Sequence, residues 1–106
     1  MTKIEKSAAN IYADLGVPDA EAMHVKAGLA AKIADIINTR QLTQTEAAAM
    51  LGISQPKLSG LLRGQFRGIS ESKMIDCLNR LGRDVEIVVR SPKRSKRPGQ
   101  TRVVLA

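Results

Sequence analysis

The sequence contains 106 residues, of which 43% are hydrophobic and 25% are charged, and it carries a net charge of +7 at pH 7. This length fits one small domain, close to the lower limit for a self-sufficient hydrophobic core. A single cysteine and a single histidine exclude an internal disulfide and provide no catalytic or metal-binding cluster, so we expect neither an enzyme nor a bound cofactor. With no signal-peptide pattern and no apolar stretch long enough to cross a bilayer, the sequence predicts a cytoplasmic protein.

The first predicted elements are an N-terminal segment, residues 1–17, and a long helix. Apolar residues before Gly16 predict a short helical stretch within the segment, at Ile11, Tyr12 and Leu15. Pro18, with acidic residues just after it, is typical of the first turn of a new helix. This helix is expected to continue to about Arg40, because apolar residues repeat at helical spacing at Val25, Leu29, Ile33, Ile36 and Ile37.

Residues 43–64 predict two short helices joined by a tight turn. Thr43 and Glu46 form a capping box that begins the first helix. Gly52 supplies the left-handed conformation that ends it, and Ser54 is a good N-cap for the second helix. Small and apolar residues suited to contacts between the two helices are Ala47, Ala48, Leu51, Ile53, Leu58 and Leu61. The motif is therefore a helix-turn-helix.

The second helix of the motif has an outward face suited to the major groove of DNA. At about 100° per residue, the inward side chains are those of Leu58, Leu61 and Leu62, and the outward positions are Pro56, Lys57, Ser59, Gly60 and Arg63. Gln55, at the exposed N-terminal end, can present its amide to adenine, or it is simply a solvated first-turn residue. Lys57 and Ser59 are expected to contact bases or phosphates, and the Pro56 ring a thymine methyl group.

After the motif, a loop of residues 65–68 leads to Ser70, which is expected to cap a further helix. The apolar residues of that helix predicted to face the core are Met74, Leu78 and Leu81, with Gly82 ending it. Cys77 lies among these apolar positions, so we expect it to be a buried structural thiol. The helices together form a predicted DNA-binding domain of residues 18–82.

Residues 83–89 predict a dimerisation strand. The apolar pattern changes from helical to alternating, with Val85, Ile87 and Val89 on one face. A lone strand leaves unpaired backbone groups, so we expect it to pair with the same strand of a second copy and give a homodimer. The alternative is a hairpin with residues 103–105 of the same chain.

The positive charge is concentrated in a basic tail, residues 90–106. The tail holds six of the 17 basic residues and none of the ten acidic residues, so the other 89 residues carry a net charge of only +1. Its two prolines, one glycine and two serines disfavour regular structure. We expect the tail to attract DNA phosphates without sequence preference; the alternative is a tail that only solubilises the protein.

The residues from Leu42 to Gln55 read Leu-Thr-Gln-Thr-Glu-Ala-Ala-Ala-Met-Leu-Gly-Ile-Ser-Gln, which resembles the core of the XRE family, the Cro and lambda-repressor group. The resemblance implies an all-α, lambda-repressor-like helical bundle, to which the predicted C-terminal β-strand is added. It also implies that Gln44 holds a phosphate from the start of its helix. Arg63 and Arg67 are likewise expected to contact phosphates. The complete set of expected DNA contacts is Gln44, Ser54, Gln55, Pro56, Lys57, Ser59, Arg63 and Arg67.

The flanking sequences, Asp14 to Gly16 and Leu81 to Ile87, resemble those of small XRE regulators that often act as HigA-type antitoxins. We therefore expect a dimeric, sequence-specific transcriptional repressor that binds a double-stranded operator with an inverted repeat. The resemblance further implies an antitoxin that autoregulates its operon and neutralises a RelE-like toxin. The alternatives are a stand-alone or phage-type repressor without a toxin, and a protein-interaction module that uses the helix-turn-helix as a scaffold.

Overall fold

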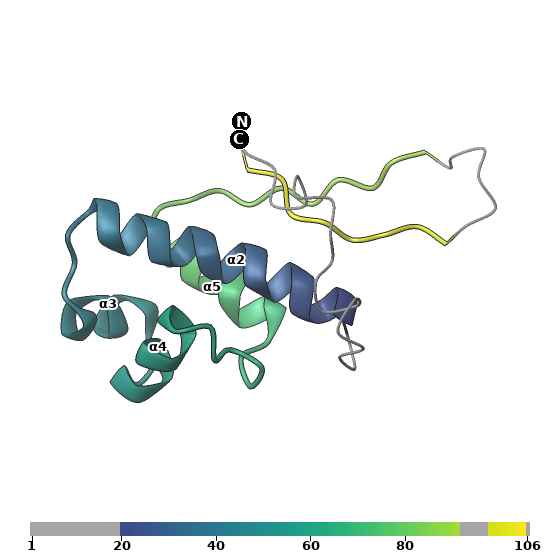
Figure 1. The fold of residues 1–106 in the computed structure, drawn as a ribbon. Helices are drawn as coiled ribbons and strands as arrows, with labels where there is room; N and C mark the ends of the chain where they lie inside the picture. The colour runs from purple at the N-terminus through teal and green to yellow at the C-terminus, as the bar shows by residue number, and fades with distance from the viewer. Residues whose placement is uncertain (1–19, 92–97, 106) are drawn as a thin grey trace.

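The computed structural model describes residues 20–91 and 98–105 (Figure 1). Its helices are α2 (Ala20–Thr39), α3 (Gln44–Leu51), α4 (Gln55–Leu62) and α5 (Glu71–Arg80). Helix α2 packs against α4 and α5, and α3 packs against α4 and α5. Figure 1 shows α3 and α4 together on one side of the long α2. The predicted helical stretch near Ile11 lies outside the described residues.

The predicted all-α architecture is confirmed in these residues, and the core is built from the apolar faces of the helices. The largest side chains that are almost completely buried are those of Ile33, Ile36, Leu51, Leu58, Met74 and Cys77. Burial raises the pKa of the Cys77 thiol, as expected for a structural cysteine. Phe66 and Ile69, in the loop between α4 and α5, are also buried, although the sequence pattern predicted only a connecting loop there.

The helix boundaries follow local capping signals. Ser54 and Ser70 are the N-caps of α4 and α5, and each hydroxyl oxygen accepts a hydrogen bond from the backbone N–H three residues later. Helix α3 ends at Gly52, whose φ of 67° lies in the left-handed region. The backbone N–H of Ile53 then donates to the carbonyl oxygen of Ala48 at 3.2 Å, which closes the helix end and starts the turn.

The predicted strand is not present within the described part of the chain. Residues 83–91 lie outside any helix or strand and form no ladder with each other or with residues 103–105, so the hairpin alternative is wrong for this structure. Alternation of apolar residues is not sufficient for a strand, because a strand also needs a neighbouring strand to receive its hydrogen bonds. Pairing with a second copy stays a prediction.

Part of the basic tail lies against α2. The backbone N–H of Thr101 donates to Glu21 Oε1 at 2.7 Å, and Val103 packs against the core. In Figure 1 the segment of residues 98–105, drawn in yellow, lies on the side of α2 away from α3 and α4. Its composition predicted little regular structure, and the described segment forms no helix, although Val104 takes part in a β-bridge. Contact between the tail and DNA stays a prediction.

Candidate DNA-binding interface

Helix α4 presents its N-terminal turn to solvent while its opposite face is fixed in the core. Leu58 and Leu61 are buried, whereas Gln55, Pro56 and Lys57 are exposed. The Ser54 hydroxyl oxygen accepts a hydrogen bond from the backbone N–H of Lys57 at 3.3 Å. The three exposed side chains therefore project from a turn whose backbone is held by its cap.

Helix α3 begins with the predicted capping box. The backbone N–H of Thr43 donates to Glu46 Oε1 at 2.9 Å, and the backbone N–H of Glu46 donates to Thr43 Oγ1 at 3.1 Å. The backbone hydrogen bond from Thr43 is the main reason that the pKa of Glu46 is lowered, and the Thr43 side chain adds to it. Gln44, the first residue of the helix, is exposed beside this cap.

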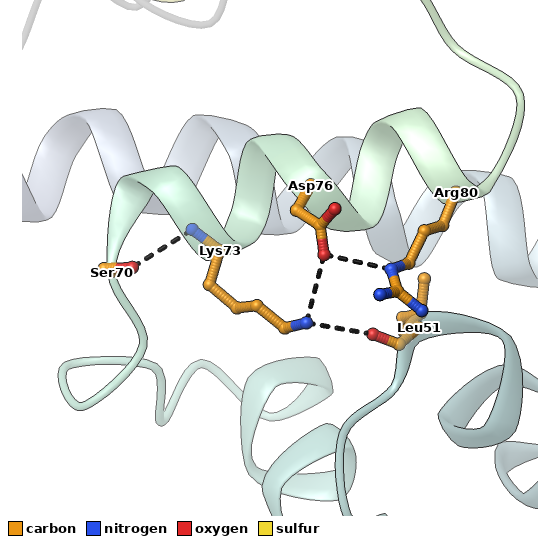
Figure 2. Close-up of polar contacts among 5 residues, drawn as sticks. All are labelled: Leu51, Ser70, Lys73, Asp76 and Arg80. Carbon is orange, nitrogen blue, oxygen red and sulfur yellow. Dashed lines mark hydrogen bonds and ion pairs between the residues drawn. The ribbon is translucent and has the colours of Figure 1, made fainter.

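The turn between α3 and α4 is held by side chains of α5 (Figure 2). Lys73 Nζ donates to the carbonyl oxygen of Leu51 at 3.2 Å and to Asp76 Oδ2 at 3.1 Å. Arg80 Nε donates to the same Asp76 oxygen at 3.0 Å. The hydrogen bond from Lys73 is the largest cause of the lowered pKa of Asp76, with Arg80 contributing further. This cluster was not predicted from the sequence.

The guanidinium group of Arg80 also lies over the turn itself. A Cβ atom added to Gly52 would lie 3.0 Å from Arg80 Nη1, which is closer than ordinary van der Waals contact. Lys73 supplies positive charge at the C-terminal end of α3, where the carbonyl oxygens lack partners within the helix. Helix α5 thus fixes the position of the turn from which α4 begins.

The loop after α4 carries the basic residues predicted to contact phosphates. Arg63 and Arg67 are both exposed. Lys26 Nζ, on α2, donates to the carbonyl oxygen of Arg67 at 2.8 Å and lies 3.9 Å from Glu71 Oε1. Because Phe66 is buried beside it, the backbone around Arg67 is fixed on two sides. The side chain of Arg67 then extends from an anchored loop.

The burial of Gly60 differs from the prediction. The helical spacing placed it on the open outward face of α4, but in the structure it is buried. The cause is Gln65, whose backbone N–H donates to the carbonyl oxygen of Gly60 at 2.7 Å. A Cβ atom at Gly60 would lie 3.2 Å from the backbone oxygen of Gln65 and 3.9 Å from its side-chain Oε1. Helical periodicity could not reveal this cover because it comes from the following loop.

The predicted DNA-contacting residues come from α3, the turn between α3 and α4, α4 itself and the loop that follows α4. Those with exposed side chains are Gln44, Ser54, Gln55, Pro56, Lys57, Arg63 and Arg67, while Ser59 is half-buried.

The predicted dimerisation residues do not share one environment. Val85 packs against the core, whereas Ile87 and Val89 are 81% and 92% exposed.

The described residues offer neither a cluster suited to a metal ion nor a helix suited to a membrane. No group of three or more His, Cys, Asp or Glu side chains is placed to hold a metal ion there. None of the described helices combines the length and apolar character that a bilayer span requires.

Comparison with known proteins identifies the architecture. The profile of a family described as a helix-turn-helix domain matches residues 11–90. A solved structure named "Putative XRE Family Transcriptional Regulator" is 42% identical in sequence, with a TM-score of 0.77, and the match covers 84% of this chain and 100% of that one. The comparison with curated proteins found no match. From the profile and the solved structure together, the chain belongs to the XRE family of helix-turn-helix transcriptional regulators.

Proposed function

We propose that this DNA-binding transcriptional regulator is a sequence-specific repressor that inserts α4 into the major groove of its operator. The observation that carries the proposal is the exposed turn of Gln55, Pro56 and Lys57, held by the Ser54 cap on a helix whose other face is buried. A glutamine amide at this position matches the donor and acceptor pattern of adenine in the major groove.

The remaining predicted contacts would position this helix. Gln44 at the start of α3 can donate to a phosphate, and the helix N-terminus favours the negative charge. Arg63 and Arg67 add positive charge on the loop side of α4. Ser54 retains its hydroxyl hydrogen as a donor, because its cap uses only the oxygen as an acceptor. Ser59, being half-buried, is suited to a short contact only.

We further propose that the active form is a homodimer paired through residues 84–89. Ile87, Val88 and Val89 are 81%, 64% and 92% exposed, which is a costly arrangement for three consecutive apolar residues unless a partner covers them. A two-fold dimer would read an inverted repeat whose half-sites lie about one helical turn apart, roughly 34 to 36 Å. Light scattering of the Ile87→Pro variant, with Ile87→Val as its control, tests the interface.

The experiment that tests the proposed function is a gel-shift titration across the DNA upstream of the gene. The proposal predicts one tight complex on a fragment that contains an inverted repeat, which survives an excess of unrelated DNA. Equal affinity for every fragment, including the unrelated DNA, would show that only the charge of the protein attracts DNA and would contradict the proposal.

The antitoxin role is a finer proposal, supported by the resemblance of the flanking sequences to HigA-type regulators. It predicts that a neighbouring reading frame encodes a small RelE-like ribonuclease that forms a complex with this protein. Co-expression followed by purification of the tagged regulator tests it. Recovery of the regulator alone, with operator binding intact, would favour a stand-alone or phage-type repressor.

A further inference from the structure

Helix α4 lacks a side chain at one position of its outward half. With about 100° between successive residues, Gly60 lies on the half that faces away from Leu58 and Leu61, close to the direction of Pro56. A residue in this place on a helix lying in the major groove is within reach of base edges. Glycine contributes no donor or acceptor of its own there beyond the backbone.

The side chain of Gln65 covers the position. Its backbone N–H is bonded to the carbonyl oxygen of Gly60 at 2.7 Å, and its Oε1 atom lies 3.9 Å from where a Cβ of residue 60 would be. Gln65 is nevertheless exposed to solvent, so its amide lies over α4 without being buried by another part of the described chain. The burial of Phe66, the next residue, anchors the loop that carries it.

Arg63 contacts the oxygen of this amide. Its Nη2 atom donates a hydrogen bond to Gln65 Oε1 at 3.4 Å. Because the oxygen is engaged in this way, the two N–H donors of the amide are directed to other acceptors. Guanine is the base that presents two acceptors, O6 and N7, in the major groove.

We propose that Gln65 is a second base-reading residue, which takes the place of the side chain that Gly60 lacks. Its amide N–H groups donate hydrogen bonds to a guanine, while Arg63 binds the amide oxygen of Gln65. The inference rests on the proposed function, since it requires α4 to lie in the major groove. It adds a residue outside the helix-turn-helix motif to the specificity of the protein, and it explains why glycine is suitable at residue 60. A Cβ there would lie 3.2 Å from the Gln65 backbone oxygen, so the loop would have to shift by a few tenths of an ångström to admit it.

The test is selection of operator sequences from a randomised library by the wild-type protein, Gln65→Ala and Gln65→Glu. We expect Gln65→Ala to reduce discrimination about 5- to 150-fold at one guanine of each half-site, and to leave the other positions unchanged. Gln65→Glu keeps an acceptor for Arg63 but replaces the donors by a carboxylate. It is therefore expected to change the preference at that position from guanine towards cytosine, whose N4 is a donor.

Gln55→Ala is the matched control, because it should alter a different base pair. Thermal unfolding of each variant checks the fold, which should persist because the Gln65-to-Gly60 bond is made by backbone atoms. An equal loss of affinity on all sequences would mean that Gln65 contacts a phosphate, and this would overturn the inference. Unchanged base preferences in both Gln65 variants would overturn it too. A wild-type protein without any base preference would instead overturn the proposed function itself.

Discussion

Lys73 Nζ, on α5, lies 3.2 Å from the carbonyl oxygen of Leu51, the last residue of α3. The two residues are 22 positions apart, and their contact joins the helix after the DNA-binding motif to the turn inside it. Since the same ammonium group also contacts Asp76, its position is fixed from both helices. The orientation of α3 relative to α5 depends on this contact as well as on apolar packing.

Lys73→Met should therefore destabilise the protein. Methionine keeps most of the apolar stem but leaves the α3 carbonyl without its charged donor, and we expect a loss of about 1 kcal/mol in the free energy of unfolding. Urea denaturation measures it. Lys32→Met is the control, because Lys32 pairs with Asp35 within α2, at 3.4 Å, and an exposed pair of this kind contributes less than about 0.5 kcal/mol. Equal losses of unfolding free energy in the two variants would show that the contact with Leu51 contributes no more than an ordinary surface ion pair.

Gly52→Ala should be destabilising mainly because of the backbone. The φ of 67° costs a residue with a Cβ about 1 to 2 kcal/mol, and the contact with the movable end of the Arg80 side chain adds little. Gly82→Ala has a φ of 84° but no neighbouring atom within 4 Å, so it isolates the backbone cost. We expect similar losses for these two variants in urea denaturation. A much larger loss for Gly52→Ala would mean that Arg80 cannot move away.

Acidification should weaken the capping box. Because the pKa of Glu46 is lowered in the folded state, its charge contributes stability that is present above its unfolded pKa of about 4.3. This contribution is lost as the pH falls through the folded pKa. Glu46→Gln keeps an acceptor for the Thr43 N–H but removes the charge. The difference in unfolding free energy between wild type and variant should accordingly shrink between pH 7 and pH 3. A difference independent of pH would show that the charge of Glu46 does not stabilise the capping box.

The salt dependence of DNA binding should distinguish the loop after α4 from the described part of the tail. Arg67→Ala is expected to reduce the slope of log affinity against log salt by about 1, as for a lost phosphate contact. Arg102→Ala should leave the slope unchanged, because its segment lies on the side of α2 away from α3 and α4. A reduced slope for Arg102→Ala would show that residues 98–105 also reach DNA, whereas an unchanged slope limits the expected phosphate contacts of the basic tail to its other basic residues.

The sequence predicted those features that depend on neighbouring residues. The capping box at Thr43, the turn at Gly52 and the cap at Ser54 involve residues at most a few positions apart, so the bounds of α3 and α4 could be derived from them. The periodicity of α2 likewise identified its buried face. These local signals were sufficient to place Gln55 on an exposed helical turn.

Contacts between distant segments could not be derived in this way. Nothing in the spacing of residues indicates that Lys73 reaches the end of α3 or that Lys26 binds the loop at Arg67. The cover that Gln65 provides over Gly60 depends on the path of the chain after α4, which periodicity within the helix does not describe. The alternation in residues 84–89 predicted a strand without identifying a partner for it.

The measurement that tests the central claim most directly is operator selection by the wild-type protein and Gln55→Ala in parallel. Base reading by the first turn of α4 predicts that the variant loses about 1 to 3 kcal/mol of discrimination at one base pair in each half-site. Its affinity for unrelated DNA and its thermal unfolding should stay close to those of the wild type, because Gln55 is exposed. If the variant retains the wild-type preference at every position, α4 does not read DNA through Gln55 and the account of the interface is wrong.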